Sequence, residues 1–125
     1  MEAGETIKFR WSPHLWVVVS DPKQNPDEIL LVNFSSRKPG VPFDSACMAN
    51  VGDHAYLRTP SFVYYRFARV ASNAALEAQI ASGQADASAW PPVSASLLDR
   101  IRKGAGASKF IARKHRQLLK DQGLI

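Results

Sequence analysis

Two apolar runs constrain the fold of this chain most strongly. Residues 15–19 read LWVVV, and residues 29–34 read ILLVNF, with Asn33 as the one polar position. Apolar runs of this length that are rich in β-branched side chains are typical of strands covered on both faces. The loop between them contains Pro22 and Pro26, and such a loop most simply joins an antiparallel pair. We therefore expect these two strands to form the centre of a sheet.

Weaker strand signals flank this pair. Residues 7–9 alternate apolar and polar side chains and precede a turn at Pro13, and residues 44–50 and 55–57 are candidates for short strands. Residues 62–70 alternate in the manner of a half-buried strand. One side of that strand would carry Phe62, Tyr64, Arg66 and Ala68, and the other side would carry Val63, Tyr65, Phe67 and Arg69. The pattern leaves open which side faces the core.

Three helices are expected after the strands. Ser72 or Asn73 is a suitable N-cap for a helix over residues 74–82, and Gly83 follows its end. A second helix is predicted over residues 95–103, ended by the glycines at 104 and 106, and a third over residues 109–122, capped by Ser108. In the third helix the residues expected to point inward are Phe110, Ile111, Leu118 and Leu119. Strands first and helices last predict the α+β class.

The length and the distribution of charge suggest one core with a basic tail. A chain of 125 residues has the size of a single domain. We expect residues 1–92 to form a β-rich domain with the short helix, and residues 93–125 to form a basic helical tail packed on the same domain. Residues 1–95 carry a net charge of −1, and residues 96–125 carry +6. Such a tail fits a polyanionic partner, nucleic acid or an acidic protein, or a solvated helix face.

The composition predicts a cytoplasmic protein without a membrane span. No apolar run approaches the roughly 20 residues that a bilayer-spanning helix needs, and the first residues show no cationic segment followed by an apolar run. The single cysteine, Cys47, excludes an intrachain disulfide and fits a reducing compartment. The histidines and Cys47 match no zinc-ligand spacing, so we expect no metal and no other cofactor.

Reactive side chains are concentrated in residues 47–65, and a second polar group follows the strand that ends near residue 34. Metal-free RNA cleavage needs a base for the 2′-hydroxyl, an acid for the leaving oxygen, and a cation or hydroxyl at the phosphate. The predicted catalytic residues are His54, Arg58, Ser35, Ser36 and Asp53. The predicted RNA-binding residues are His14, Arg37, Lys38, Ser61 and Tyr65. The alternative is that these polar residues only satisfy turns at strand ends.

Cys47 offers a different chemistry. A thiol near His54 could be a nucleophile, because an adjacent imidazolium lowers the pKa of a thiol. A lone cysteine in a strand is more often a small apolar core residue. A thiol enzyme is therefore one hypothesis for the function, and it predicts inactivation by Cys47→Ser.

The order of several segments resembles that of the MazF/PemK/Kid toxins. The segments are GETI at 4–7, PHLWVVVS at 13–20, ILLVNFSS at 29–36, SFV at 61–63 and ARV at 68–70. The toxins have a Gly-Asp-Ile opening strand, an Arg-Pro-x-Leu-Val-Val-Ser strand and a strand ending in Thr or Ser. The resemblance implies a small, strongly bent antiparallel β-barrel with attached helices, usually dimeric, that cleaves single-stranded RNA without a metal. It also implies an antitoxin as a partner.

Position by position, the resemblance assigns only a few residues. Ser35 or Ser36 matches the active-site hydroxyl, and Pro13 matches the proline of the Arg-Pro pair. Ser12 stands where the family has arginine, so the cation would come from Arg37 or Arg58, or the activity is lost. The first hypothesis is therefore a toxin-like ribonuclease. The second is a non-catalytic module that binds nucleic acid or protein through the same barrel.

Overall fold

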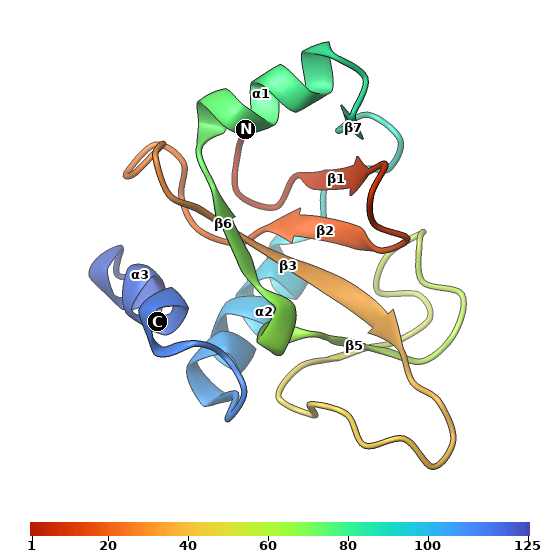
Figure 1. The fold of residues 1–125 in the computed structure, drawn as a ribbon. Helices are drawn as coiled ribbons and strands as arrows, with labels where there is room; N and C mark the ends of the chain where they lie inside the picture. Colours follow the sequence, from red (N-terminus) through yellow and green to blue (C-terminus); the bar gives the residue numbers. More distant parts are fainter.

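The computed structural model describes residues 1–125 and has seven antiparallel strands and three helices, so the predicted α+β class is confirmed (Figure 1). The strands are β1 (Thr6–Phe9), β2 (Leu15–Val18), β3 (Ile29–Ser36), β4 (Met48–Ala49), β5 (Ser61–Val63), β6 (Arg69–Ala71) and β7 (Ala85–Asp86). A 3₁₀ turn, η1, spans Tyr65–Phe67. The helices are α1 (Asn73–Ala81), α2 (Ala95–Ala107) and α3 (Arg113–Asp121).

The sheet is built around β3. Its strand order is β4-β5-β3-β2-β1-β7, and β6 pairs with the first half of β3 while β5 pairs with the second half. The two outer strands, β4 and β7, do not pair with each other, so the sheet is not closed. The expected barrel is therefore not confirmed.

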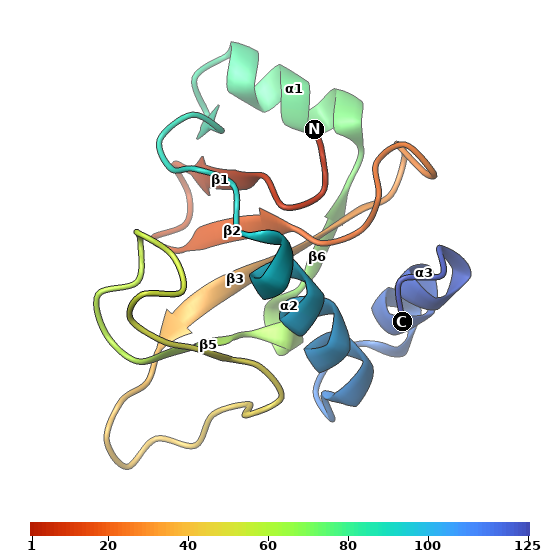
Figure 2. The same cartoon turned by 180° about the vertical axis from the view of Figure 1, so that it is seen from behind.

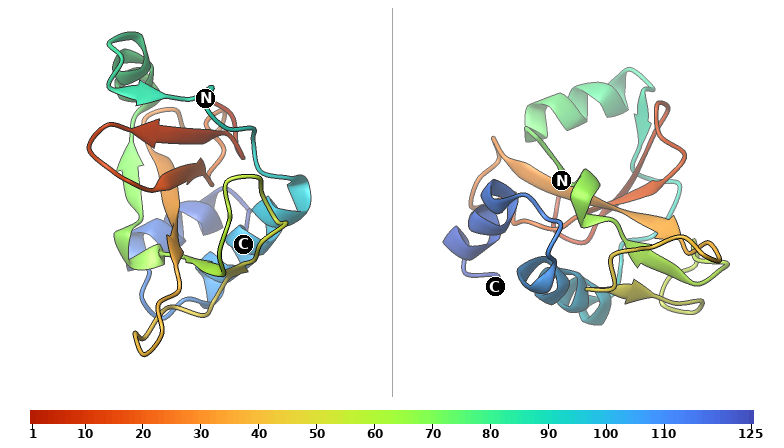
Figure 3. Two further views of the ribbon diagram at one scale, coloured as in Figure 1. Left: turned by 90° about the vertical axis from the view of Figure 1, so that its right-hand side faces the viewer. Right: turned by 60° about the horizontal axis from the view of Figure 1, so that its bottom comes forward.

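The apolar parts of the two central strands are covered on both faces, as their sequence predicts. Alternate residues of β3 enter different clusters: Leu30 and Val32 lie in a core of 19 buried residues, and Ile29 and Leu31 lie in a second core of 8. The larger core includes residues of α2 and α3, and the smaller one includes Leu76 of α1. The left panel of Figure 3 shows α1 and α2 on opposite sides of the sheet.

The strand predicted over residues 62–70 is wrong. The chain forms β5, turns through η1 and continues as β6. Tyr65 explains the break, because its side chain is fully buried and its hydroxyl donates to the carbonyl oxygen of Ile101 at 2.7 Å. Of the two weaker strand candidates, residues 44–50 keep only β4, and residues 55–57 form no strand.

The helical tail also differs from the prediction at the end of α2 and at the start of α3. The glycines at 104 and 106 lie within α2 and do not end it, because Gly104 packs against Tyr65 and Cys47, where no side chain fits. The third helix begins at Arg113 and not at residue 109. Ser108 instead accepts the amides of Phe110 and Ile111, at 3.1 and 3.2 Å, and so holds a short linker. None of the three helices has the length and apolar character needed to cross a membrane.

Candidate functional site

Half of one sheet face has no helix over it. On β3, Ile29, Leu31, Asn33 and Ser35 share a face, because strand side chains alternate. Ile29 and Leu31 lie in the small core together with α1, whereas Asn33 and Ser35 lie beyond it. Figure 1 shows no helix in front of this end of β3, and Figure 2 shows α2 crossing the opposite face. This uncovered end is where a partner can reach the sheet.

A row of aromatic rings lies over the uncovered end. The ring centroids are 5.5 Å apart for Phe43 and Phe62, 5.2 Å for Phe62 and Tyr64, and 4.3 Å for the stacked pair Tyr64 and Phe67. Nearby, Trp11 stacks on Phe9 at 4.8 Å. Phe67 is 54% exposed and Trp11 is 52% exposed. We call Trp11, Phe43, Phe62, Tyr64 and Phe67 the aromatic face.

Arginines accompany the aromatic face without acidic partners. The guanidinium of Arg37 lies 4.4 Å from the centroid of Phe43, and that of Arg69 lies 4.5 Å from Trp11. Neither arginine is in any of the three ion pairs of the structure, nor is Arg66. Exposed rings with free cations are the means by which proteins hold single-stranded nucleic acid, since bases stack and phosphates attract the charge.

A pocket of about 510 Å³ opens at one end of the aromatic face. Its wall is formed by residues 11–14, Trp16, Asn33 and residues 66–69. Asn33 is 1% exposed; its amide nitrogen donates to the carbonyl oxygen of Phe34 at 3.2 Å, and its Oδ1 has no partner. Buried acceptors are normally satisfied, so this unpaired oxygen behind the pocket wall is unusual.

His14 lies at the same pocket, beside the end of β3. Trp16 is paired with Asn33, and continuing this antiparallel register by two residues brings His14 level with Ser35. Burial lowers the pKa of His14, and the positive charge of Lys8 lowers it further. Lys38 also acts on the ring in this sense. A neutral imidazole with cations close by suits a base that acts near a phosphate.

Part of the predicted polar constellation does come together. Ser36 is paired with Ser61, and the hydroxyl of Thr59 donates to Oγ of Ser36 at 3.3 Å. The amide of Arg37 donates to the carbonyl oxygen of Pro60 at 3.0 Å. Arg58, next to Thr59, is exposed and forms no ion pair. The end of β3 therefore meets the segment that carries Arg58.

His54 lies elsewhere, and both its ring nitrogens are occupied by the protein itself. The amide of Tyr56 donates to Nδ1 at 3.1 Å, and Nε2 lies 2.8 Å from the carbonyl oxygen of Pro91. A carbonyl only accepts, so Nε2 carries the proton. The side chain is 7% exposed. In this arrangement both ring nitrogens of His54 are used within the protein, and its catalytic role stays a prediction.

Three further predicted residues are also used internally. Asp53 pairs with Arg100 of α2 at 3.1 Å, and this hydrogen-bonded guanidinium lowers the pKa of Asp53, so it is no proton donor at neutral pH. Tyr65 is fully buried. Ser61 is 4% exposed and donates to the carbonyl oxygen of Thr59 at 2.9 Å. All three side chains therefore make their contacts within the protein, and their roles at RNA stay predictions.

Two other chemistries concern the Cys47 thiol and a bound metal ion. Burial raises the pKa of the Cys47 thiol, which keeps it protonated and weakly nucleophilic. No group of three His, Cys, Asp or Glu side chains that could hold a metal ion lies together.

Comparison with solved structures gives a likeness in fold. No family model and no curated protein matches the sequence. The fold is similar to a chain in the crystal structure of MazE-MazF (Form-III) from Deinococcus radiodurans, with a TM-score of 0.50 and 17% identity over 86% of this chain and 93% of that chain. The chain has a MazF-like fold. At this identity the likeness concerns the fold alone.

The position where the resembled family has arginine has a structural role here. Ser12 is 8% exposed, and its hydroxyl oxygen accepts from the indole of Trp16 at 3.0 Å and from the amide of His14 at 3.2 Å. Ser12 thus fixes the turn that presents His14 and Trp11. The cations of the site come instead from residues outside this turn.

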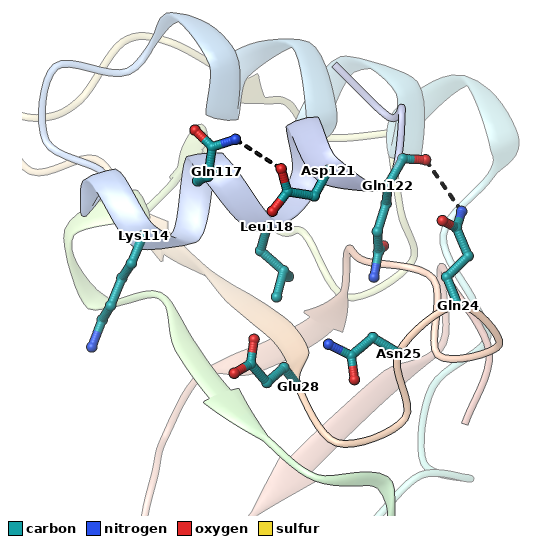
Figure 4. Close-up of a pocket in the computed structure, with 8 residues that line it drawn as sticks. All are labelled: Gln24, Asn25, Glu28, Lys114, Gln117, Leu118, Asp121 and Gln122. Atoms are coloured by element: carbon teal, nitrogen blue, oxygen red, sulfur yellow. Dashed lines mark hydrogen bonds between the residues drawn. The ribbon is translucent and has the colours of Figure 1, made fainter.

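Another hollow, of about 390 Å³, lies between the β2–β3 loop and α3 (Figure 4). Two hydrogen bonds join its lining residues: Gln117 donates to Asp121 at 2.8 Å, and Gln24 donates to the carbonyl oxygen of Gln122 at 3.2 Å. Gln122 in turn accepts the amide of Asp21 at 2.7 Å. The hydrogen bonds of Gln122 attach α3 to the β2–β3 loop beside the hollow.

Sequence reasoning missed most of the aromatic face. The alternation in residues 62–70 places Phe62, Tyr64 and Arg66 on one side, and that was the available signal. Phe43 and Trp11 come from loops, where no periodicity indicates a direction.

Proposed function

We propose that this protein is a toxin-like, metal-independent endoribonuclease that acts on single-stranded RNA. The observation that carries the proposal is the aromatic face with its unpaired arginines, which runs beside His14 and Ser35 at the uncovered end of β3. The MazF-like fold supports the same class of function.

The chemistry follows from the groups at this end of the sheet. Neutral His14 takes the proton of the 2′-hydroxyl, whose oxygen then bonds to phosphorus while the bond from phosphorus to the 5′-oxygen breaks. The hydroxyl of Ser35 or Ser36 and the cation of Lys38 or Arg58 stabilise the charge on the phosphate oxygens. Water supplies the proton for the leaving 5′-oxygen. The products are a 2′,3′-cyclic phosphate and a free 5′-hydroxyl.

The test is cleavage of end-labelled single-stranded RNA by purified, folded protein in the presence of EDTA. We expect cleavage by the wild type and its loss in His14→Ala and in the double variant Ser35→Ala/Ser36→Ala, and a His54 variant that is folded should still cleave. If the wild type leaves every RNA intact while binding it tightly, the catalytic part of the proposal is wrong.

That outcome would favour the alternative, a non-catalytic RNA-binding module. Its support is that Asp53 and His54, the acid and imidazole that the sequence places closest together, are both used for internal bonds. In that case variants of the aromatic face weaken binding, and His14→Ala changes binding little.

The proposal includes two protein partners. The similar chain comes from a structure of MazE with MazF, so we propose that an antitoxin binds this protein and that two copies form a dimer. Purification after co-expression with the adjacent reading frame, followed by light scattering, tests both points.

A further inference from the structure

We propose that the hollow between the β3–β4 loop, η1 and the α2–α3 linker binds one unstacked base of single-stranded RNA. The inference rests on the proposed RNA binding and adds a base-binding pocket to it. The hollow measures about 200 Å³ and is lined by residues 42–44, Tyr64, Arg66 and Phe110. This is smaller than the roughly 300–1,000 Å³ of pockets for drug-sized ligands, and it suits a single flat ring system.

The walls of the pocket are aromatic. Phe43 and Tyr64 belong to the aromatic face, and both lie against Phe62 between them, at centroid distances of 5.5 and 5.2 Å. Phe110 forms a further wall and comes from the helical tail. It is 47% exposed, although the sequence pattern predicts it to point inward. A large ring held at the surface beside two others provides the stacking contacts that an unpaired base requires.

The pocket is rigidly built. Asp44 at its floor is 8% exposed and accepts the hydroxyl of Ser108 at 2.6 Å and the amide of Ala46 at 3.0 Å. Ser108, which is 1% exposed, accepts the amide of Phe110 at 3.1 Å. One buried pair, Asp44 and Ser108, therefore fixes the loop on one side of the pocket and the linker on the other. The backbone that carries Phe110 is held in place before any ligand arrives.

The charges around the pocket favour a nucleotide over an uncharged ring. Arg66 lies with its guanidinium 4.9 Å from the centroid of Phe110, and Arg37 lies 4.4 Å from that of Phe43. Neither has an acidic partner in an ion pair. They are placed to attract the phosphates on either side of a base that enters the pocket. The Asp44 carboxylate at the floor can accept an N–H of that base.

The pocket also lies on a continuous path. Arg66 lines both this pocket and the larger one that contains His14 and Asn33. A strand of RNA that crosses the aromatic face can therefore place one base beside Phe110 and a neighbouring segment beside His14. In this way the tail contributes to RNA recognition through a ring and not through its positive charge.

The experiment measures the binding of fluorescent 2′-O-methyl RNA, which cannot be cleaved through its 2′-oxygen, by anisotropy. We expect Phe110→Ala to raise the Kd about tenfold, the effect of losing one stacked base. Phe110→Trp should retain the affinity. Val51→Ala, which removes an apolar side chain that is 61% exposed in a different loop, should change nothing.

Oligonucleotides with a single abasic site identify the base. For the wild type, one abasic position should weaken binding about as much as Phe110→Ala does, and in Phe110→Ala that position should cost nothing further. The base pocket is disproved if the wild type binds RNA and Phe110→Ala binds it equally well. It is also disproved if the loss of affinity in Phe110→Ala adds to the loss caused by an abasic site at every position. In both cases the proposed function stands. If the wild type binds no RNA, both are wrong.

Discussion

The Nε2 atom of His54 lies 2.8 Å from the carbonyl oxygen of Pro91, and this contact joins two loops that are far apart in the chain. The same oxygen accepts the hydroxyl of Thr6 at 3.1 Å. Because Nδ1 accepts the amide of Tyr56, the imidazole connects the turn after β4 to the segment that leads into α2. His54, the imidazole that the sequence pattern favours as catalytic, thus stabilises the fold in this structure.

Replacing His54 should affect stability and leave catalysis in place. His54→Ala removes the partners of two backbone groups, so we expect the free energy of unfolding to fall by about 1–3 kcal/mol, as measured by urea denaturation. RNA cleavage per folded molecule should stay close to that of the wild type. If a folded His54→Ala protein cleaved RNA orders of magnitude more slowly, His54 would be a catalytic residue.

The rate of RNA cleavage should fall with acid pH at a midpoint below the ordinary His value of 6.5. Burial and Lys8 lower the pKa of His14, so its neutral, proton-accepting form persists as the pH falls toward that lowered pKa. Lys8→Gln removes one cause of the shift and should move the acid limb of the rate profile to higher pH. An acid limb that Lys8→Gln does not move would point to another base.

The sequence predicted those parts of the fold that local patterns determine. The runs that became β2 and β3 are apolar where helices cover both faces of the sheet, and the cap at Ser72 marks the start of α1. The interruption at Tyr65 could not be predicted, since it depends on a hydrogen bond to Ile101, 36 residues away. From the sequence, Gly104 likewise indicates a helix end, because its contact with Tyr65 is visible only in the structure.

The site was harder to predict because it depends on what the helices leave uncovered. Alternation correctly places Phe62, Tyr64 and Arg66 together, but only the position of α1 decides that this side faces solvent. Part of the positive charge in the tail serves the fold. Arg100 and Arg102 of α2 are engaged by Asp53 and by the carbonyl oxygen of Val19, so they stabilise the fold.

The two glycines of α2 should respond to alanine in opposite directions. A Cβ on Gly104 would lie 2.8 Å from the Cβ of Cys47 and closer still to the hydroxyl of Tyr65, so Gly104→Ala should cost about 1–3 kcal/mol through overpacking. On Gly106 the nearest atom beyond the helix is 3.7 Å away, in Ile125. Gly106→Ala should therefore stabilise the protein by about 0.5–1 kcal/mol. Thermal unfolding distinguishes the two, and equal effects would contradict this packing.

Acid should weaken the protein partly through His115 of α3. This side chain is 8% exposed and its Nδ1 is buried without a partner; burial lowers its pKa, and Lys114 lowers it further. The unfolded chain then binds a proton at a higher pH than the folded one, so stability falls as the pH drops through 6.5 toward the lowered pKa. His115→Leu should flatten the dependence of Tm on pH between 7 and 5. An unchanged slope in His115→Leu would show that the buried nitrogen finds a partner in solution.

RNA binding should depend on salt through the arginines of the aromatic face. Arg69 and Arg37 lie over Trp11 and Phe43 without acidic partners, so each is free to contact one phosphate. Each contact with a single strand contributes about 0.7 to the slope of log K against log salt. Arg69→Gln and Arg37→Gln should each reduce that slope by about this amount across different RNA sequences, because phosphate contacts carry no sequence information. Lys23→Gln makes the same change of charge in the β2–β3 loop, at the opposite end of β3 (Figure 1), and should leave the slope unchanged. Equal reductions in all three variants would mean that net charge alone governs the binding.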